Sequence, residues 1–339
     1  MSIDSYRFVM IPMLPVLMQA TKSARTTMAE WFDCYPPRYP WMVASDYCIG
    51  DINKPNDVLS FVIIAPHDTA DNICEYIAGA APKDLKNTKN IPVGLMQYLT
   101  CEVPVTFSIS FVLKRQEALL RAHLKVENML DFVPGAIAYL EHRLEKYPAE
   151  RTVEVHEEMV TRFKAFGREL ASKNLNAKLA RQMHLAAATS ATVFNNLNLA
   201  KQPKAIRWIS DRDALIARHD AVVYDLTYVY YMLQAEIHAM GEIEAGRTVP
   251  TTQADLGFEI PEQTGKHRYD EIVRLPDYLA GTLADLNNET MTLSRDKFDV
   301  VLNNVFVNSK TNWVVQLLSG EGLVTARSAL FRGQHQRRQ

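Results

Sequence analysis

The order of strand-like and helix-like segments is the feature that most constrains how this chain can fold. Apolar segments at 41–48, 58–66 and 103–112 precede a helical pattern over 115–199, and further strand-like segments at 205–210 and 251–260 each precede another helical pattern. Strands close in sequence can pair as antiparallel hairpins, whereas parallel strands need long crossover connections. We therefore predict a mixed α/β sheet with an antiparallel meander first and parallel crossovers later.

This order of elements is that of a ribonuclease H-like fold, and it divides the chain. Residues 1–40 form an N-terminal extension, and residues 41–290 form the ribonuclease H-like domain, with 115–200 as a helical insertion or cap. Residues 291–339 are predicted to form a C-terminal helical extension with a basic tail. No Gly/Ser-rich or Pro-rich linker separates two halves, which favours one elaborated domain.

Composition limits the partners and the compartment. The 339 residues carry a formal charge of −2, so a nucleic-acid partner would need a local basic patch rather than a globally basic surface. The cysteines are spread out with no CxxC pair, and the apolar start at 8–18 lacks a basic leader and a cleavage site of the secretory type. We expect a cytoplasmic protein with reduced thiols and no membrane partner. The cysteines are Cys34, Cys48, Cys74 and Cys101.

The stretch VRLPDYLAG, residues 273–281, places a single carboxylate among apolar residues. Val273, Leu275 and Leu279 recur at helical spacing, so Asp277 should lie beside a stripe that faces the core. A buried carboxylate needs either hydrogen-bond donors or a cation. The sequence leaves both possibilities open for Asp277.

Two other acidic residues follow predicted strands. Asp46 is predicted to end the first strand and Asp211 the fourth, and with Asp277 they could form a cluster of like charges that a cation must compensate. Magnesium and manganese prefer such oxygen ligands, and a two-metal site could hydrolyse a phosphodiester. Each Asp alone is more often a turn former or helix cap, and Asp213, on the same strand face as Asp211, competes for either role.

A resemblance to a known family supports this interpretation. VRLPDYLAGTLADL resembles the late helix of a bacterial and phage family known as domain of unknown function thirty-eight hundred, whose pattern runs Ile-Gln-Leu-Ala-Asp-Leu-Leu-Ala-Gly, and Asp277 falls on its Asp. The family's first strand typically ends in Asp-Glu-Ser-Gly. This chain has Asp46 and Gly50 there, but Tyr47 and Cys48 replace the Glu-Ser pair.

Two looser matches extend the resemblance over roughly residues 41–290. The segment DLKN at 84–87 is similar to a family pattern of an acidic residue, an apolar residue, Lys and a small polar residue, and Asp211 with Arg212 is similar to a later strand-end pair. The resemblance implies a ribonuclease H-like fold and a metal-dependent nuclease.

The resemblance also implies roles for particular residues. Asp46, Asp211 and Asp277 would be ligands of Mg²⁺ or Mn²⁺. Asp84 would be a fourth acidic member of the catalytic set, and Lys86 would orient a phosphate or the nucleophilic water.

The function predicted first is therefore a metal-dependent nuclease of RNA or DNA, acting in phage defence or a mobile element. The alternative is a catalytically inactive scaffold of the same fold that acts as a protein-interaction or nucleic-acid-binding subunit. The helical block at 115–199 or the apolar segment at 313–318 could then bind a protein partner or a second copy of the chain. His267 precedes the helix of Asp277 closely enough to line the same cleft.

Overall fold

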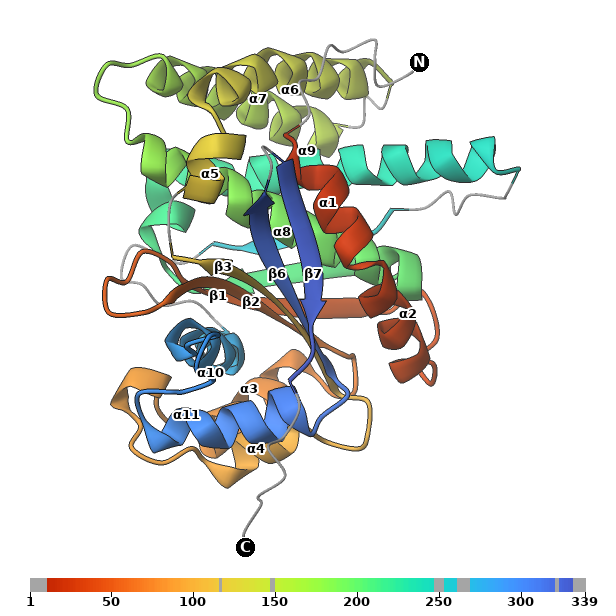
Figure 1. The fold of residues 1–339 in the computed structure, drawn as a ribbon. Helices are drawn as coiled ribbons and strands as arrows, with labels where there is room; N and C mark the ends of the chain where they lie inside the picture. The colour runs from red at the N-terminus through yellow and green to blue at the C-terminus, as the bar shows by residue number, and fades with distance from the viewer. Residues whose placement is uncertain are drawn as a thin grey trace, which may run out of the picture.

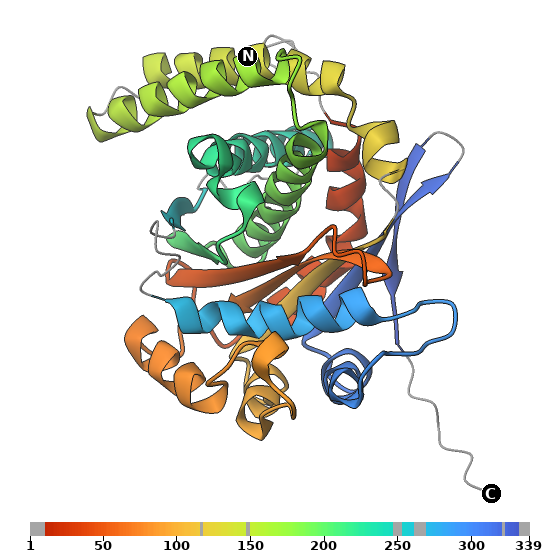
Figure 2. The same cartoon turned by 90° about the vertical axis from the view of Figure 1, so that its left-hand side faces the viewer.

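A seven-stranded mixed sheet crosses the centre of the protein, with helices on both faces (Figures 1 and 2). The computed structural model describes residues 11–115, 118–146, 150–246, 253–260, 269–320 and 323–331. The prediction of a mixed α/β sheet is confirmed. The strands are β1 (Pro40–Cys48), β2 (Asn56–Ile64), β3 (Thr106–Lys114), β4 (Ala205–Ser210), β5 (Asp255–Glu259), β6 (Asn312–Gly320) and β7 (Leu323–Ala329).

The strand order is β5-β4-β1-β2-β3-β6-β7. β1, β2 and β3 form an antiparallel meander, β4 is parallel to β1, and β5 is parallel to β4. The meander and the later parallel crossovers were both predicted from the order of segments. Because the helical block intervenes between β3 and β4, the chain returns to the other side of β1 and places the carboxyl ends of β1 and β4 together.

The larger helical layer covers what we name the α8 face of the sheet (Figure 1). Consecutive small residues at 186–188 are fully buried, which lets α8 approach its neighbour α9 closely. The block predicted as an insertion thus contributes a helix to the main core, while α6 and α7 pack as an outer pair (Figure 2). The helices are α1 (Met13–Ala20), α2 (Lys22–Trp31), α5 (Ala118–His123), α6 (Val126–Lys146), α7 (Glu150–Leu170), α8 (Ala177–Lys201) and α9 (Ala214–Glu244).

The opposite side of the sheet, which we name the α10 face, is covered by the helix that was predicted to contain Asp277. Trp41, Val43 and Tyr47 of β1 are buried toward the α8 face, whereas Ala44 is buried toward the α10 face. Side chains alternate along a strand, so Asp46 also projects toward the α10 face. The elements here are α3 (Ala70–Ala80), η2 (Leu85–Asn87), α4 (Val93–Leu99), α10 (Asp270–Asp285), α11 (Asp296–Val301) and the π-helical η3 (Leu302–Val307).

The prediction of a helical C-terminal extension is wrong for residues 312–329. They form β6, which pairs in parallel with β3, and β7, which pairs with β6, so this region belongs to the central sheet. Val315 and Leu317 are buried on the α8 face and Val314 on the α10 face. An apolar run that is buried on both faces lacks the strand period, which is why the sequence did not distinguish it from a helix. Of the predicted basic tail at 326–339, residues 326–329 belong to β7, and residues 332–339 lie outside the described residues.

The long helix predicted from Ala214 is interrupted near its start. His219, Asp220 and Ala221 have φ of 54°, 54° and 58°, in the left-handed region that such residues rarely adopt. A first helical turn is thereby separated from the rest of α9. No helix in the described parts of the chain is long and apolar enough to cross a membrane.

Candidate carboxylate site

Two neighbouring strands and one helix bring the predicted acidic residues to the same end of the sheet. Ser45 of β1 pairs with Ser210 of β4, and the Asp211 N–H donates to the Ser45 carbonyl at 3.2 Å. Asp46 and Asp211 therefore follow directly paired residues. The prediction that Asp46 ends the first strand is wrong, because β1 continues for two more residues, to Cys48.

The charges of these side chains interact. Burial raises the pKa of Asp46 well above its usual range, and the carboxylates of Asp277 and Asp211 raise this pKa further. Burial also raises the pKa of Asp277 to about 6, with contributions from Asp84 and Asp211. Desolvation by the surrounding protein raises the pKa of Asp211, and the charges of Asp270 and Asp84 raise it further. The structure thus holds several like charges within electrostatic reach of one another.

A cavity of ≈ 200 Å³ opens beside these carboxylates. Its lining combines acidic residues from three elements with two cations. Asp46 does not line this cavity, although its charge interacts with the residues that do. In the described parts of the chain, no group of three or more His, Cys, Asp or Glu side chains is arranged to hold a metal ion. The lining residues are Asp84, Lys86, Asp211, Asp270, Val273, Arg274 and Asp277.

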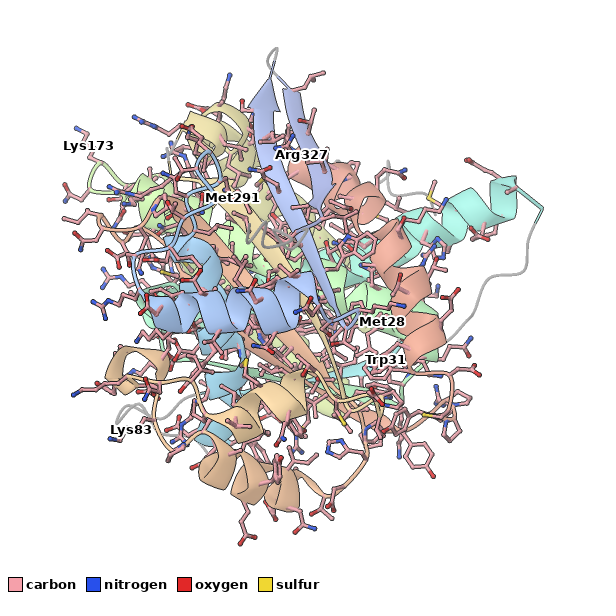
Figure 3. All side chains as sticks on the ribbon, turned by 60° about the horizontal axis from the view of Figure 1, so that its bottom comes forward. Met28, Trp31, Lys83, Lys173, Met291 and Arg327 are labelled. Atoms are coloured by element: carbon pink, nitrogen blue, oxygen red, sulfur yellow. The ribbon has the colours of Figure 1, made fainter. Side chains whose placement is uncertain are left out.

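The segment at 81–88 is held against α10 and contributes Asp84 and Lys86 to the cavity. The Leu85 N–H donates to Asp277 Oδ2 at 2.7 Å, and the Arg274 guanidinium donates to the Ala81 carbonyl at 2.9 Å. Lys297 Nζ donates to the Leu85 carbonyl at 2.6 Å. One oxygen of Asp277 therefore positions this segment. Of the two partners that the sequence left open for Asp277, a hydrogen-bond donor is present at this oxygen. Lys83 marks the segment in Figure 3.

Gly281 allows the same segment to approach α10 closely. A Cβ added at this position would collide with the end of the Leu85 side chain. Gly281 is four residues after Asp277, which places both on one side of the helix. The small residue in VRLPDYLAG thus permits the close packing that carries the Leu85 N–H to the Asp277 carboxylate.

Asp213 has a different role from Asp211. Its Oδ1 accepts from the Leu215 N–H at 3.0 Å, which makes it the N-cap of α9. Asp211 Oδ1 accepts from the Arg212 N–H at 2.7 Å, and Asp211 lines the cavity. The sequence left these two residues as competitors, and the structure assigns the cap to Asp213.

Two residues of the cavity were missed by sequence analysis. Asp270 and Arg274 precede Asp277 by seven and three residues, so all three lie on one side of α10. Arg274 Nε lies 3.8 Å from Asp84 Oδ1 and supplies positive charge inside the acidic cluster. The helical spacing of these three residues was the available signal.

The departures at positions 47 and 48 affect opposite faces of the sheet. Tyr47 points away from the carboxylates into the α8 face, where its hydroxyl lies 2.8 Å from Ser45 Oγ. Cys48 packs on the α10 face, and burial together with the charge of Asp46 raises the pKa of its thiol to about 12. A side chain at position 47 points away from the carboxylates, so the presence of Tyr there does not change the acidic cluster. Cys48 stays a neutral thiol near neutral pH.

Comparison of the chain with protein-family models, curated proteins and solved structures gave no match. The family resemblance of the late helix thus stays a prediction. His267, which was predicted to line the cleft, lies outside the described residues.

Proposed function

We propose that this protein is a metal-dependent nuclease of ribonuclease H-like fold that hydrolyses phosphodiester bonds of RNA or DNA. The observation that carries the proposal is the interaction of the Asp46, Asp211 and Asp277 carboxylates at the adjoining ends of β1 and β4. Burial and like charge both disfavour ionised carboxylates there, and a bound cation would reverse this effect. Phage defence or a mobile element is the setting that we propose for the activity.

The arrangement of strands supports the fold assignment. The antiparallel order β3-β2-β1, followed by parallel β4 and β5, is the sheet expected of a ribonuclease H-like domain. In this interpretation β6 and β7 are an addition beyond β3. Asp211 follows the end of β4 and lines the cavity together with Asp277 of α10, while Asp46 lies near the end of the neighbouring strand β1.

Carboxylate oxygens are the donors that Mg²⁺ and Mn²⁺ prefer, but among the described residues no three acidic side chains are arranged around one ion position. Binding would therefore require these side chains to move together. Asp46, Asp211 and Asp277 would hold the cation, with Asp84 as a further acidic ligand or acceptor. The cation when bound would supply Lewis-acid polarisation of the phosphodiester and activation of a water. Asp277 can offer Oδ1 while Oδ2 keeps its bond to the Leu85 N–H.

A basic groove adjoins the carboxylates and offers a place for substrate phosphates. It has a volume of ≈ 780 Å³, and Lys86 lines both the groove and the acidic cavity. Lys89 and Arg295 also line it. Lys86 lowers the pKa of Asp277, although burial and the neighbouring carboxylates outweigh this effect. Lys86 is exposed and is thus suited to orient a phosphate beside the carboxylates.

The proposal is tested by cleavage assays on single-stranded, duplex and RNA–DNA hybrid substrates with Mg²⁺ or Mn²⁺. We expect Asp211→Asn to abolish cleavage and Asp213→Asn to preserve it, since Asn is also a good N-cap. These variants make the same change two residues apart. Equal activity of both variants would contradict the assignment of Asp211.

Metal binding gives a second measurement that does not depend on the choice of substrate. Mn²⁺ should raise the melting temperature of the wild-type protein, because a ligand that binds only the folded state stabilises it. Asp277→Asn should remove most of this rise. Absence of any metal-dependent change in the wild type would count against the proposal.

The alternative function, an inactive scaffold with a protein partner, is favoured by a separate observation. Met240 and Ile243, near the end of α9, are 39% and 66% exposed, and their spacing places them on one side of the helix. A scaffold would show no cleavage with any metal. It would lose its partner or its dimeric state when Ile243 is changed to Lys, as measured by sedimentation.

A further inference from the structure

A buried lysine of α11 binds the segment that carries Asp84 and Lys86. Helix α11 packs against α10 on the α10 face (Figure 1). Lys297 of α11 is 8% exposed, and its Nζ donates to the Leu85 carbonyl at 2.6 Å and to the Thr88 carbonyl at 2.9 Å. Burial disfavours an ammonium group unless it has such partners. The two bonds therefore fix this segment relative to α11.

The two carbonyls lie at the two ends of the short helix η2. Leu85 is its first residue, and Thr88 is the residue that follows its end. Carbonyl groups at the end of a helix lack partners within the helix, and a lysine side chain can supply them. Lys86 lies between the two bonded residues. The ammonium group thus holds the backbone on both sides of the side chain that lines the acidic cavity and the basic groove.

Leu85 links the lysine to the carboxylate of Asp277. Its carbonyl accepts from Lys297, and its N–H donates to Asp277 Oδ2 at 2.7 Å. A cation of α11 and an anion of α10 are therefore connected through the backbone of one residue. Loss of the bond to the carbonyl would free the Leu85 N–H to move, and the Asp277 carboxylate would lose the donor that orients it.

We propose that Lys297 is a positioning residue of the carboxylate site. It holds the Leu85 N–H on Oδ2 of Asp277, which leaves Oδ1 for a cation, and it holds Asp84 and Lys86 beside the same cavity. The proposal rests on the nuclease function proposed above, in which Asp277 is a metal ligand. Lys297 itself lines the basic groove, whereas the residues that it holds line the acidic cavity.

Amide hydrogen exchange of the metal-free protein tests this role without an assay of metal or substrate. Lys297→Met keeps an unbranched apolar side chain and removes both bonds. The Leu85 amide should exchange at least about tenfold faster in this variant, because loss of hydrogen bonds from a charged donor favours local opening. NMR of the full chain measures the rate for this amide.

Lys54→Met is the matched control. Both ammonium groups lie over the ring of Phe298, with Nζ 4.6 Å from its centroid for Lys54 and 5.4 Å for Lys297. Lys54 differs in its partner, since its Nζ donates to Asp285 Oδ1. Exchange of the Leu85 amide should therefore stay within about twofold of the wild type in Lys54→Met.

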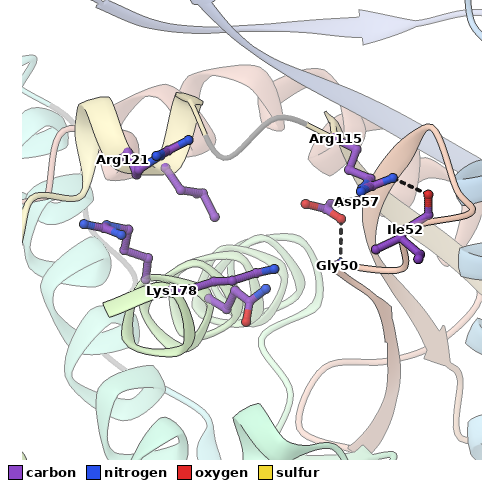
Figure 4. A pocket seen from close by; sticks show the side chains of 9 residues that line it. Gly50, Ile52, Asp57, Arg115, Arg121 and Lys178 are labelled. Atoms are coloured by element: carbon purple, nitrogen blue, oxygen red, sulfur yellow. Dashed lines mark hydrogen bonds between the residues drawn. The ribbon is translucent and has the colours of Figure 1, made fainter. Parts of the chain in front are cut away.

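The backbone around Lys54 has hydrogen bonds that the substitution leaves in place. Lys54 belongs to the connection between β1 and β2, where the Gly50 N–H donates to Asp57 Oδ1 at 2.7 Å (Figure 4). The Lys54 N–H donates to the Asp51 carbonyl at 3.1 Å. The control thus removes a lysine of the same face without releasing its own segment.

Metal affinity and steady-state kinetics connect Lys297 to the carboxylates. Lys297→Met should weaken Mn²⁺ binding by about 10–100-fold, the usual effect of losing a group that orients metal ligands. It should lower kcat for an oligonucleotide substrate and leave KM within about twofold. Lys54→Met should keep both near the wild-type values. Lys297→Gln, which retains an N–H donor, replaces Lys297→Met in all three measurements if the latter does not fold.

The outcomes separate this proposal from the nuclease proposal. Unchanged exchange of the Leu85 amide in Lys297→Met, or equal acceleration in Lys54→Met, overturns the positioning role. A raised KM with unchanged kcat also overturns it, and assigns Lys297 to phosphate binding in the groove. A wild-type protein that neither binds Mn²⁺ nor cleaves nucleic acid contradicts the nuclease function, and the exchange rates alone then decide whether Lys297 positions the segment.

Discussion

The two faces of the sheet bury ionisable side chains in opposite ways. On the α8 face, His184 lies where α6, α7, α8 and α9 meet, with the rings of Phe132, Phe166 and Tyr230 centred within 6.0 Å of its own. Burial lowers its pKa to about 3, so it is neutral at physiological pH. On the α10 face, Asp277 has a pKa of about 6 and is mostly charged at pH 7.

This difference teaches what each face is built to do. His184 is neutral in the core, where burial disfavours its charged form, and its Nδ1 lies 2.6 Å from the Tyr230 hydroxyl. Asp277 instead lies beside an open cavity that Asp84 and Asp211 also line, where a cation can reach these carboxylates. On the α8 face, the neutral His184 contributes to core packing. On the α10 face, the carboxylates repel one another, and a bound cation would offset this repulsion.

Asp46→Asn should give the largest effect, with activity and stability changing in opposite directions. We expect more than about a 100-fold loss of cleavage, because even outer-shell partners of a metal site contribute about 10–100-fold. Without metal, the variant should melt at a higher temperature than the wild type, since a repelled charge is removed. Calorimetry in EDTA and the cleavage assay measure the two changes. A lower melting temperature would show that Asp46 is a structural residue like His184.

Phe132→Ala tests the packing side of the comparison. The ring is fully buried against His184 and Tyr230, so its loss should lower the free energy of unfolding by about 3–5 kcal/mol. Denaturant titration measures this change. Cleavage per folded molecule should stay near the wild-type value, and a specific loss of activity would break the separation between the two faces.

The pH dependence of stability should reveal His184. Its folded-state pKa is lowered from 6.5 to about 3, so the unfolded chain takes up a proton first and stability falls as the pH decreases below about 6.5. Between pH 6.5 and pH 4 the loss from this group amounts to about 3 kcal/mol. His184→Gln should flatten this part of the curve by about that amount, whatever its stability at pH 7. Equal slopes for the wild type and His184→Gln would contradict the neutral, buried state of His184.

Tyr47→Phe should have the smallest effect. Tyr47 adjoins Asp46 in sequence but lies on the α8 face, so loss of its hydroxyl removes the buried hydrogen bond to Ser45, and a bond of this kind contributes about 1 kcal/mol. Thermal unfolding measures this loss. Metal affinity and cleavage should be unchanged, and a strong effect on either would mean that the two faces are coupled through β1.

Local sequence patterns were sufficient for much of this fold. The meander and the parallel return of β4 follow from the order of the segments, and the burial of α10 beside Asp277 follows from the period within one segment. Local sequence also identified Asp211 and Asp213 as candidates for a helix cap or a cation ligand. In the structure, Asp213 is the cap and Asp211 lines the cavity. β6 was missed because its apolar run is buried on both faces and so shows no period.

What the sequence by itself determined was the type and order of the elements up to α10 and the carboxylates at or near the ends of β1 and β4. Only the tertiary structure decided which distant segments meet there: the Leu85 N–H reaches Asp277 across 192 positions of chain. The physical reason is that periodicity reports which side of an element is buried, but not which segment covers it. The partners of a charge are therefore set by packing between segments.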